Sequence, residues 1–225
     1  MVTAPTQTMV PARLAVFDYD GTILSGQSGS LFSRYLLSNG LVTKRTALRL
    51  FWWGVRYKLH LPFRQDEARE LIFRDLGAHG YDYATQVMRD FSHEVLEPRE
   101  RAAAKAEIRR RADEGCTTVL VSATFFEIAR LAAERLSIDG VAATRMERDA
   151  NGVDGEVVAG EGKVRAVVAW AEERFGHDWS IVYAYGDHFT DEPLLERADT
   201  PYAVCPGTTL SRIAKKRGWQ SLNWR

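Results

Sequence analysis

The chain has little cysteine, no long apolar run and no excess of charge of either sign. Its two cysteines, Cys116 and Cys205, are far apart and lack the CxxC spacing of a metal or redox motif. This excludes a disulfide scaffold and favours a reducing, cytoplasmic location. No apolar run reaches the roughly 18 residues that a membrane-spanning helix needs. Thirty basic residues balance thirty acidic ones, so the basic footprint typical of nucleic-acid binding is missing.

The first residues lack the features of a targeting signal. Residues 1–12 are polar and interrupted by proline, without the charged start and apolar stretch of a signal peptide. We expect them to form a flexible N-terminus. The remaining length suits one domain with a large insertion, or two small domains.

Most of the chain shows predicted strands that alternate with predicted helices. Four short apolar runs end in polar or turn residues, at residues 14–17, 117–121, 181–185 and 201–204. Helical spacing of apolar residues lies between them, at residues 99–114, 125–136 and 163–175. This alternation predicts an α/β fold with a parallel sheet covered on both faces. Asn151-Gly152, between two short alternating runs, predicts a hairpin within residues 146–158.

Residues 27–96 show helical periodicity and no convincing strand. One helical stripe is formed by Leu48, Phe51, Trp52, Val55 and Leu59. Leu61-Pro62 is expected to end this helix, and residues 65–76 and 81–96 are expected to form two more.

This helical stretch interrupts the α/β pattern. We therefore predict a helical cap at residues 26–97, inserted into a core made of residues 13–25 and 98–225. Gly26 and Glu97-Pro98 are the expected hinges.

Polar residues that can take part in catalysis or ligand binding stand where the predicted strands end. They are Asp18 and Asp20, then Ser122, then Asp187 and Asp191, and Lys163 begins a helix after Gly160 and Gly162. Ligands of open α/β sheets bind beyond the carboxyl ends of the strands, so we expect these side chains to converge. Converging carboxylates repel unless a cation neutralises them, and oxygen ligands suit Mg²⁺. Carboxylates, Mg²⁺ and a lysine together predict a site for phosphoryl transfer.

Each feature taken alone has a plainer interpretation. Asp-Gly is a common turn pair, Ser122 could cap the helix that begins near Phe125, and Lys163 could be a solvated first-turn residue. Asp191-Glu192-Pro193 also fits an ordinary helix start with an acidic first turn. Their shared position at strand ends favours the functional interpretation, and both roles can hold for Asp191.

The segment Phe17-Asp18-Tyr19-Asp20-Gly21-Thr22 resembles the first motif of the haloacid dehalogenase superfamily, in its phosphatase branch. Ser122, Lys163 and the stretch from Gly186 to Asp191 match the other three motifs in the right order. The helical insert resembles the cap of subfamily IB, the subgroup that contains phosphoserine phosphatase. The resemblance implies a Rossmann-like three-layer α/β/α core with a parallel sheet and an inserted helical cap.

The resemblance also implies catalytic roles. Asp18 would attack phosphorus and form an aspartyl-phosphate. Asp20 would protonate the leaving alkoxide and then activate water. Asp18, the backbone carbonyl of Asp20, and Asp187 would hold Mg²⁺. The presence of Asp20 favours phosphate esters over carbon–halogen bonds, because relatives that dehalogenate carbon lack this acid.

Further residues would bind the phosphate or support the site. Ser122, Lys163 and the backbone N–H of Ala123 would bind the phosphate oxygens that are not transferred. Asp191 would lie beside the metal waters or orient Lys163, with Thr190 next to it where phosphoserine phosphatase has an asparagine.

The substrate does not carry over with the reaction. Phosphoserine phosphatase has a glutamate nine residues after the nucleophile, which meets the substrate's amino group, whereas this chain has Gln27. We expect a small phosphorylated metabolite that is not clearly phosphoserine, with Gln27, Arg49, Arg56 and His188 as candidate specificity residues. A phosphotransferase, a phosphatase for a lipid-like phosphate and a non-catalytic binding module remain as alternatives. The sequence predicts no oligomeric state.

Residues 44–64 combine basic and aromatic side chains without an acidic one. The cations are Lys44, Arg45, Arg49, Arg56, Lys58 and Arg64, and the aromatics interleaved with them include Phe51, Trp52, Trp53 and Tyr57. The favoured interpretation is an amphipathic cap helix with packed aromatics and solvated cations. The alternative is a surface for an anionic or lipid-like substrate, or for a membrane interface.

Overall fold

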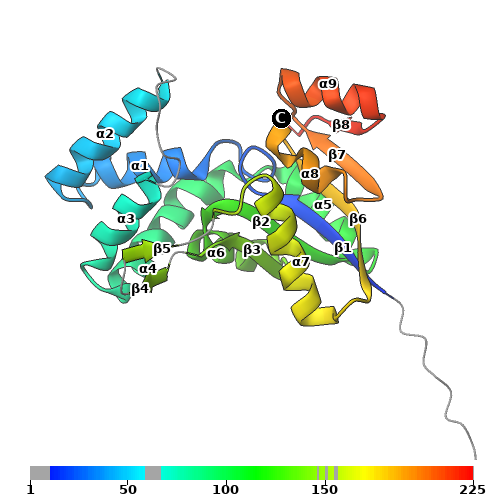
Figure 1. Cartoon of the computed structure of the whole chain (residues 1–225), viewed down its shortest axis with the longest axis horizontal. Helices are drawn as coiled ribbons and strands as arrows, with labels where there is room; N and C mark the ends of the chain where they lie inside the picture. Colours follow the sequence, from blue (N-terminus) through cyan, green and yellow to red (C-terminus); the bar gives the residue numbers. More distant parts are fainter. Residues whose placement is uncertain (1–10, 59–66, 146, 150–151, 155–156, 225) are drawn as a thin grey trace, which may run out of the picture.

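A parallel sheet lies at the centre of the computed structural model, which describes residues 11–58, 67–145, 147–149, 152–154 and 157–224. Within these residues the sheet has six strands in the order β3-β2-β1-β6-β7-β8 (Figure 1). They are β1 (Ala12–Asp18), β2 (Thr117–Phe125), β3 (Gly140–Thr144), β6 (Trp179–Gly186), β7 (Thr200–Val204) and β8 (Gln220–Leu222). All neighbouring strands pair in parallel, so their carboxyl ends lie at one edge of the sheet.

Helices cover both faces of this sheet. One face carries α5 (Ala102–Asp113) and α6 (Phe126–Leu136), and the other carries α7 (Glu161–Phe175), α8 (Glu192–Leu195) and α9 (Thr208–Arg217). Strand β1 serves both, because successive side chains of a strand point to opposite faces. Ala15 and Phe17 pack with α5 and α6, whereas Leu14 and Val16 pack with α7 to α9. The predicted three-layer α/β/α arrangement with a parallel sheet is confirmed.

The predicted strands and helices occur with shifted ends. Strand β2 continues past Ser122 to Phe125, and α7 begins at Glu161, two residues before Lys163. Strands β3 and β8 were not predicted. Strand β3 is a short run of small residues and β8 is a short polar edge strand, so both depend on pairing with a distant partner rather than on local pattern.

The stretch after β1 is helical, as expected. It contains α1 (Ser28–Ser38), α2 (Lys44–Lys58), α3 (Glu67–Gly77), α4 (Tyr81–Phe91), a π-helical turn η1 (Ser92–Leu96) and a 3₁₀ turn η2 (Glu97–Arg99). The helix predicted at residues 81–96 therefore changes its hydrogen-bonding pattern after Phe91. The predicted break at Leu61-Pro62 lies outside the described residues. Apolar residues of α1 to α4 pack in the same cluster as α5 and α6.

The chain enters and leaves this helical stretch at one place. Residues on either side of it hydrogen-bond to each other, from Ser25 N to Arg99 O (2.8 Å) and from Arg101 N to Ile23 O (2.9 Å). The side chain of Arg101 also donates to the carbonyl oxygens of Gly21 and Thr22, at 3.2 Å each. These bonds hold both connections beside the turn that follows β1.

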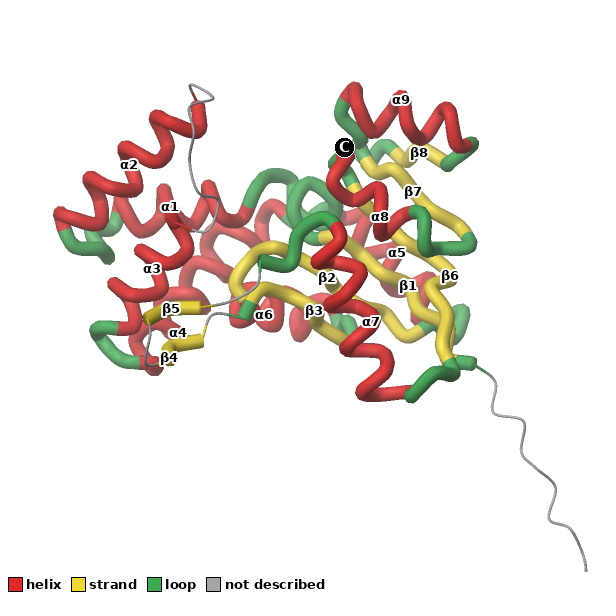
Figure 2. The backbone as a smooth tube through the Cα atoms, in the orientation of Figure 1, coloured by secondary structure: helices red, strands yellow, loops and turns green. Residues whose placement is uncertain are grey.

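A small hairpin lies against the helical stretch. Strands β4 (Glu147–Asp149) and β5 (Gly152–Asp154) pair antiparallel, as the Asn-Gly signal predicts, and the turn itself lies outside the described residues. Figure 2 shows the hairpin next to α3, which β5 contacts.

Helix α2 is oriented differently from the favoured interpretation of its sequence. Leu48, Phe51 and Trp52 are exposed, whereas Leu50 is buried and Trp53 packs on the core. The expectation of packed aromatics is therefore wrong for Phe51 and Trp52 and correct for Trp53. No helix in the described part of the chain is both long and apolar enough to cross a bilayer.

Candidate active site

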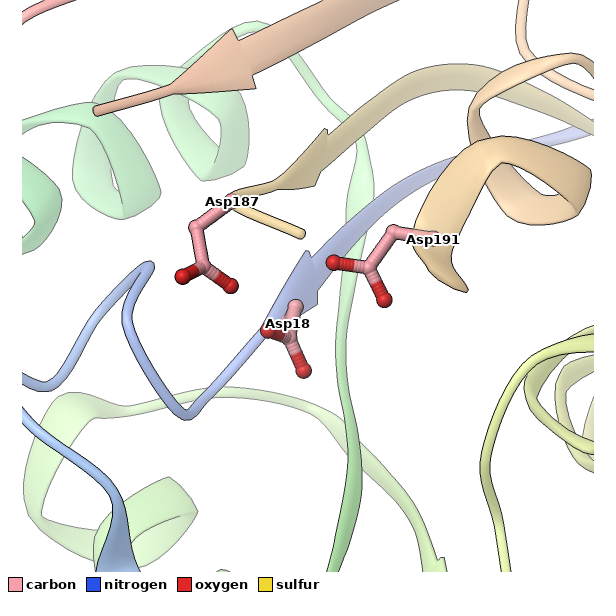
Figure 3. A group of neighbouring side chains, drawn as sticks. All are labelled: Asp18, Asp187 and Asp191. Atoms are coloured by element: carbon pink, nitrogen blue, oxygen red, sulfur yellow. The ribbon is translucent and has the colours of Figure 1, made fainter. Parts of the chain in front are cut away.

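Three carboxylates meet at the carboxyl ends of two neighbouring strands. Asp18 is the last residue of β1, Asp187 follows β6, and Asp191 ends the 3₁₀ turn η3 (Phe189–Asp191). One oxygen from each lies within 4.8 Å of the others (Figure 3). The sequence predicted that polar residues at the strand ends would converge. In the structure, the adjacent positions of β1 and β6 in the sheet bring Asp18 and Asp187 together.

Lys163 lies in the first turn of α7 and reaches this cluster. Its Nζ donates to Asp18 Oδ1 and to Asp191 Oδ1, at 2.6 Å each, and the lysine is buried. Burial alone would lower the pKa of Lys163, but the charges of Asp18 and Asp191 raise it above its ordinary value. The lysine is therefore a fixed cation and not the solvated residue of the plainer interpretation.

One ammonium does not balance three carboxylates. Burial raises the pKa of Asp18 well above its usual range, and the charges of Asp191 and Asp187 add to this, although Lys163 opposes them. Burial and the charge of Asp191 raise the pKa of Asp187 to about 7. The excess negative charge and the oxygen-only donor set fit a hard divalent cation.

Two glycines allow the carboxylates to come this close. Gly21 has φ +81°, and a Cβ there would lie 2.0 Å from Asp187 Oδ2. A Cβ at Gly186 would lie 2.7 Å from the Asp191 Cβ. Gly21 is part of the first motif, but its steric role toward a residue far along the chain could not be inferred from that motif.

Asp20 faces the helical stretch rather than the lysine. Its carboxylate accepts hydrogen bonds from Ser28 N at 2.6 Å and Ser28 Oγ at 2.9 Å, at the start of α1. Burial raises the pKa of Asp20, while the bonds from Ser28 act in the opposite direction. Sequence reasoning missed Ser28, because only the fold brings the start of α1 to this carboxylate. It also missed Thr22, whose Oγ1 makes a long bond of 3.4 Å to Asp18 Oδ2.

The predicted phosphate-binding hydroxyl lies inside β2. Ser122 is fully buried, and its Oγ accepts a hydrogen bond from Thr124 N at 3.1 Å. Helix α6 begins only at Phe126, preceded by Phe125 as its N-cap, so Ser122 does not cap it.

A pocket of about 280 Å³ opens beside Asp20, between the sheet and helices α1 to α3. Its apolar wall includes Phe32, Trp53, Ile72, Ala123 and Phe125, and its polar wall includes Gln27, Thr124 and serines of α1. Of the described residues that line it, only Asp20 and Arg69 carry a charge. Gln27 therefore lines the pocket, and its part in substrate specificity stays a prediction.

The other candidate specificity residues lie elsewhere. Arg49 is exposed on α2, and Arg56 forms an ion pair with Glu67 (Nη2 to Oε2, 3.7 Å). Neither residue lines the pocket. His188 is exposed, and its Nδ1 lies 2.9 Å from Thr190 Oγ1. Their contact with a substrate stays a prediction.

Comparison with known proteins agrees with this geometry. The family model of haloacid dehalogenase-like hydrolases matches residues 15–196. A probable phosphatase of Mycobacterium tuberculosis is 30% identical over 226 residues, covering 98% of this chain and 78% of that protein. A histidinol-phosphatase of Neisseria meningitidis is 24% identical over 225 residues, covering 95% of this chain and 99% of that protein.

Solved structures share the fold. A Bordetella pertussis protein of unknown function has a TM-score of 0.84 and 27% identity, covering 96% of this chain and 100% of that one. A phospho-aspartyl intermediate analogue of phosphoserine phosphatase has a TM-score of 0.61 and 16% identity, covering 96% of this chain and 94% of that one, and shows the fold alone. The chain belongs to the haloacid dehalogenase-like hydrolases, in the phosphatase branch whose fold is that of phosphoserine phosphatase.

Proposed function

We propose that the protein is an Mg²⁺-dependent phosphomonoester hydrolase that works through an aspartyl-phosphate on Asp18. The observation that carries this proposal is the cluster of Asp18, Asp187 and Asp191, the first and last of them buried, with Lys163 bonded to both. Carboxylates that need a cation, beside a fixed ammonium, suit a reaction in which catalysis is mostly positioning and charge neutralisation. Phosphoserine phosphatase, which shares the fold, has been solved as a phospho-aspartyl intermediate analogue.

The metal would be held by Asp18, Asp187 and the backbone carbonyl of Asp20. When bound, Mg²⁺ would neutralise the carboxylates and the charge of the phosphate oxygens. Asp191 accepts from Lys163 and from the backbone N–H of His188, so its role would be to hold the lysine in place.

The chain's own residues would carry out the chemistry in two steps. In the first, an Asp18 carboxylate oxygen bonds to phosphorus while the ester P–O bond breaks, and Asp20 gives its proton to the leaving alkoxide. In the second, Asp20 takes a proton from water, whose oxygen bonds to phosphorus and releases phosphate from Asp18. Lys163, the Ser122 hydroxyl and the Ala123 N–H would bind the oxygens that are not transferred.

The helical stretch would act as a cap over this site. We place the cap at residues 26–97 and the core at residues 13–25 and 98–225. The bonds from Ser28 to Asp20 support the assignment, because they tie the acid to the first cap helix. A cap at this position can exclude water from the phosphoenzyme while the leaving group departs.

The substrate would be a small phosphomonoester whose alcohol part is partly apolar. The pocket beside Asp20 has aromatic and aliphatic walls, and Gln27 gives it an amide where a carboxylate would pair with an amine. Phosphoserine and histidinol phosphate, the substrates that the relatives' names suggest, both carry an amine. We expect the enzyme to prefer phosphate esters without an amine, with Arg69 near any second anionic group.

The first test compares Asp18→Asn and Asp20→Asn in a phosphate-release screen with Mg²⁺. Asp18→Asn should lose at least about 10³-fold in kcat/KM, because an amide cannot attack phosphorus. Asp20→Asn should retain a phosphoryl group on the protein, detectable by intact mass, because dephosphorylation lacks its base. Asp82→Asn, an exposed carboxylate on α4, is the matched control.

Two results would contradict the proposal. Activity retained in Asp18→Asn would exclude the nucleophile. Transfer of the phosphoryl group to added glycerol in preference to water would identify a phosphotransferase.

A further inference from the structure

Helix α2 has apolar residues on two opposite faces. An α-helix turns by about 100° per residue, so Thr46, Leu50 and Trp53 share one face. Thr46 and Leu50 are buried, and Trp53 packs on the core cluster. The opposite face carries Leu48, Phe51 and Trp52, which are 69%, 62% and 62% exposed. A helix with one face in the core ordinarily presents polar residues to water, and α2 does not.

Three exposed cations lie within or beside this stripe. At 100° per residue Lys44 falls within the stripe, one turn before Leu48, and Arg45 and Arg49 lie along the edge next to Trp52. No acidic residue occurs between residues 44 and 58. Basic residues beside an apolar stripe of Trp, Phe and Leu are typical of a helix that lies in a membrane interface.

We propose that this outer face of α2 (Leu48, Phe51 and Trp52 with Lys44, Arg45 and Arg49) docks on an anionic lipid bilayer. The aromatic and leucine side chains would enter the headgroup boundary, where aromatic rings are favoured. The long cationic side chains would reach the anionic headgroups beside them. Helix α2 also lies at the outer edge of the molecule, on the side away from α9 (Figure 1).

The charge pattern favours lipid over a second copy of the chain. Two outer faces brought together would bring the cations of both copies into one interface without an acidic residue of α2 between them, and like charges repel. An anionic bilayer instead attracts all three cations. Docking has a consequence for the pocket, because Trp53 lines it from the inner face of the same helix. The pocket would then lie about one helix diameter, roughly 10 Å, from the lipid surface.

The test is co-sedimentation of the full chain with vesicles at low ionic strength. We expect binding to mixed phosphatidylglycerol and phosphatidylcholine vesicles, and at least about tenfold weaker binding to phosphatidylcholine alone. Salt at about 1 M, where the Debye length is about 3 Å, should weaken the first interaction. The Phe51→Ser/Trp52→Ser double variant should bind the mixed vesicles at least about tenfold more weakly than the unchanged chain.

Controls separate docking from loss of folding. Tyr81→Ser removes an aromatic ring that is 71% exposed on α4 and should bind as the unchanged chain does. Circular dichroism and hydrolysis of a small soluble phosphomonoester should be unchanged in the double variant. No binding at low salt, or equal binding by the double variant, would overturn the proposal. Self-association that the double variant abolishes, without vesicle binding, would overturn it in favour of a second copy.

Discussion

Proteins usually bury apolar side chains and expose charged ones. The carboxyl edge of the sheet and helix α2 differ from this rule in opposite ways. At the sheet edge, charged groups are buried: Asp18, Asp191 and Lys163 are nearly inaccessible to water. On α2, large apolar groups are exposed, with Phe51 and Trp52 each more than half accessible. Burying a charge requires a partner for it, and the sheet edge supplies one in the Lys163 hydrogen bonds. Exposing an aromatic ring requires no partner in the fold.

The difference separates two kinds of functional feature. The sheet edge depends on fixed distances between residues from β1, α7 and η3, so a change to one residue disturbs the others. The outer face of α2 contributes little to the core, so changes there should affect contacts with other molecules rather than the fold. Substitutions at and away from the sheet edge can test this contrast, from the largest expected effect to the smallest.

Lys163→Met should have the largest effect. The substitution keeps an unbranched side chain, one atom shorter, and removes the cation from between two buried carboxylates. We expect kcat/KM to fall by about 10³-fold or more. We also expect the free energy of unfolding to fall, because a buried ion pair loses one partner. Steady-state kinetics and urea unfolding measure both. Lys215→Met, which changes an exposed lysine on α9, serves as the control. A loss of less than about tenfold in kcat/KM for Lys163→Met would contradict the special role given to the sheet edge.

Gly21→Ala should have an intermediate effect. The new Cβ would meet the Asp187 carboxylate, which must move, and positive φ adds a backbone cost of about 1 kcal/mol. We expect weaker Mg²⁺ binding, measured as a higher Mg²⁺ concentration for half-maximal rate. Gly115→Ala is a matched control, with φ +78° and nothing within 4 Å of the added methyl carbon. Equal effects of the two variants would show that backbone strain alone is responsible.

A partly buried ion cluster without a proposed catalytic role should have the smallest effect on activity. Glu107 of α5 pairs with Arg110 and Arg111 and accepts from Tyr185. Burial would raise the pKa of Glu107, but the bonds from Arg110 and Tyr185 and the charge of Arg111 lower it below its ordinary value of 4.5.

The sign of the pH effect follows from this lowered pKa. A carboxyl group whose pKa is lower in the folded chain than in the unfolded chain stabilises the fold at pH values above its unfolded-state pKa. This contribution is lost as the pH falls through the pKa of the folded state. Thermal unfolding of Glu107→Gln should therefore lose less stability between about pH 6 and about pH 3 than the unchanged chain. Its kcat/KM at neutral pH should stay unchanged. If both proteins lost the same stability over this pH range, the lowered pKa of Glu107 would be contradicted.

Local pattern was enough to predict most of the sheet and the acidic residues of the site. Asp18 and Asp187 each follow a short apolar run, so their position at strand ends could be inferred without knowing the strand order. Strand β3 was missed because its Gly-Val-Ala-Ala-Thr sequence is a weak strand former that depends on pairing with β2. The Ser28–Asp20 contact was missed because nothing in the local pattern links a helix start to a carboxylate eight residues earlier.

The amino-acid sequence by itself determined the order of the motifs, the alternation of strands and helices, and the reaction class that they imply. These depend on local spacing, which survives without the fold. Only the tertiary structure decided that Lys163 lies between Asp18 and Asp191, because 145 residues separate the lysine from Asp18. It also decided which face of α2 turns outward. Both faces are apolar, so periodicity could not choose between them, and the choice came from packing against the core.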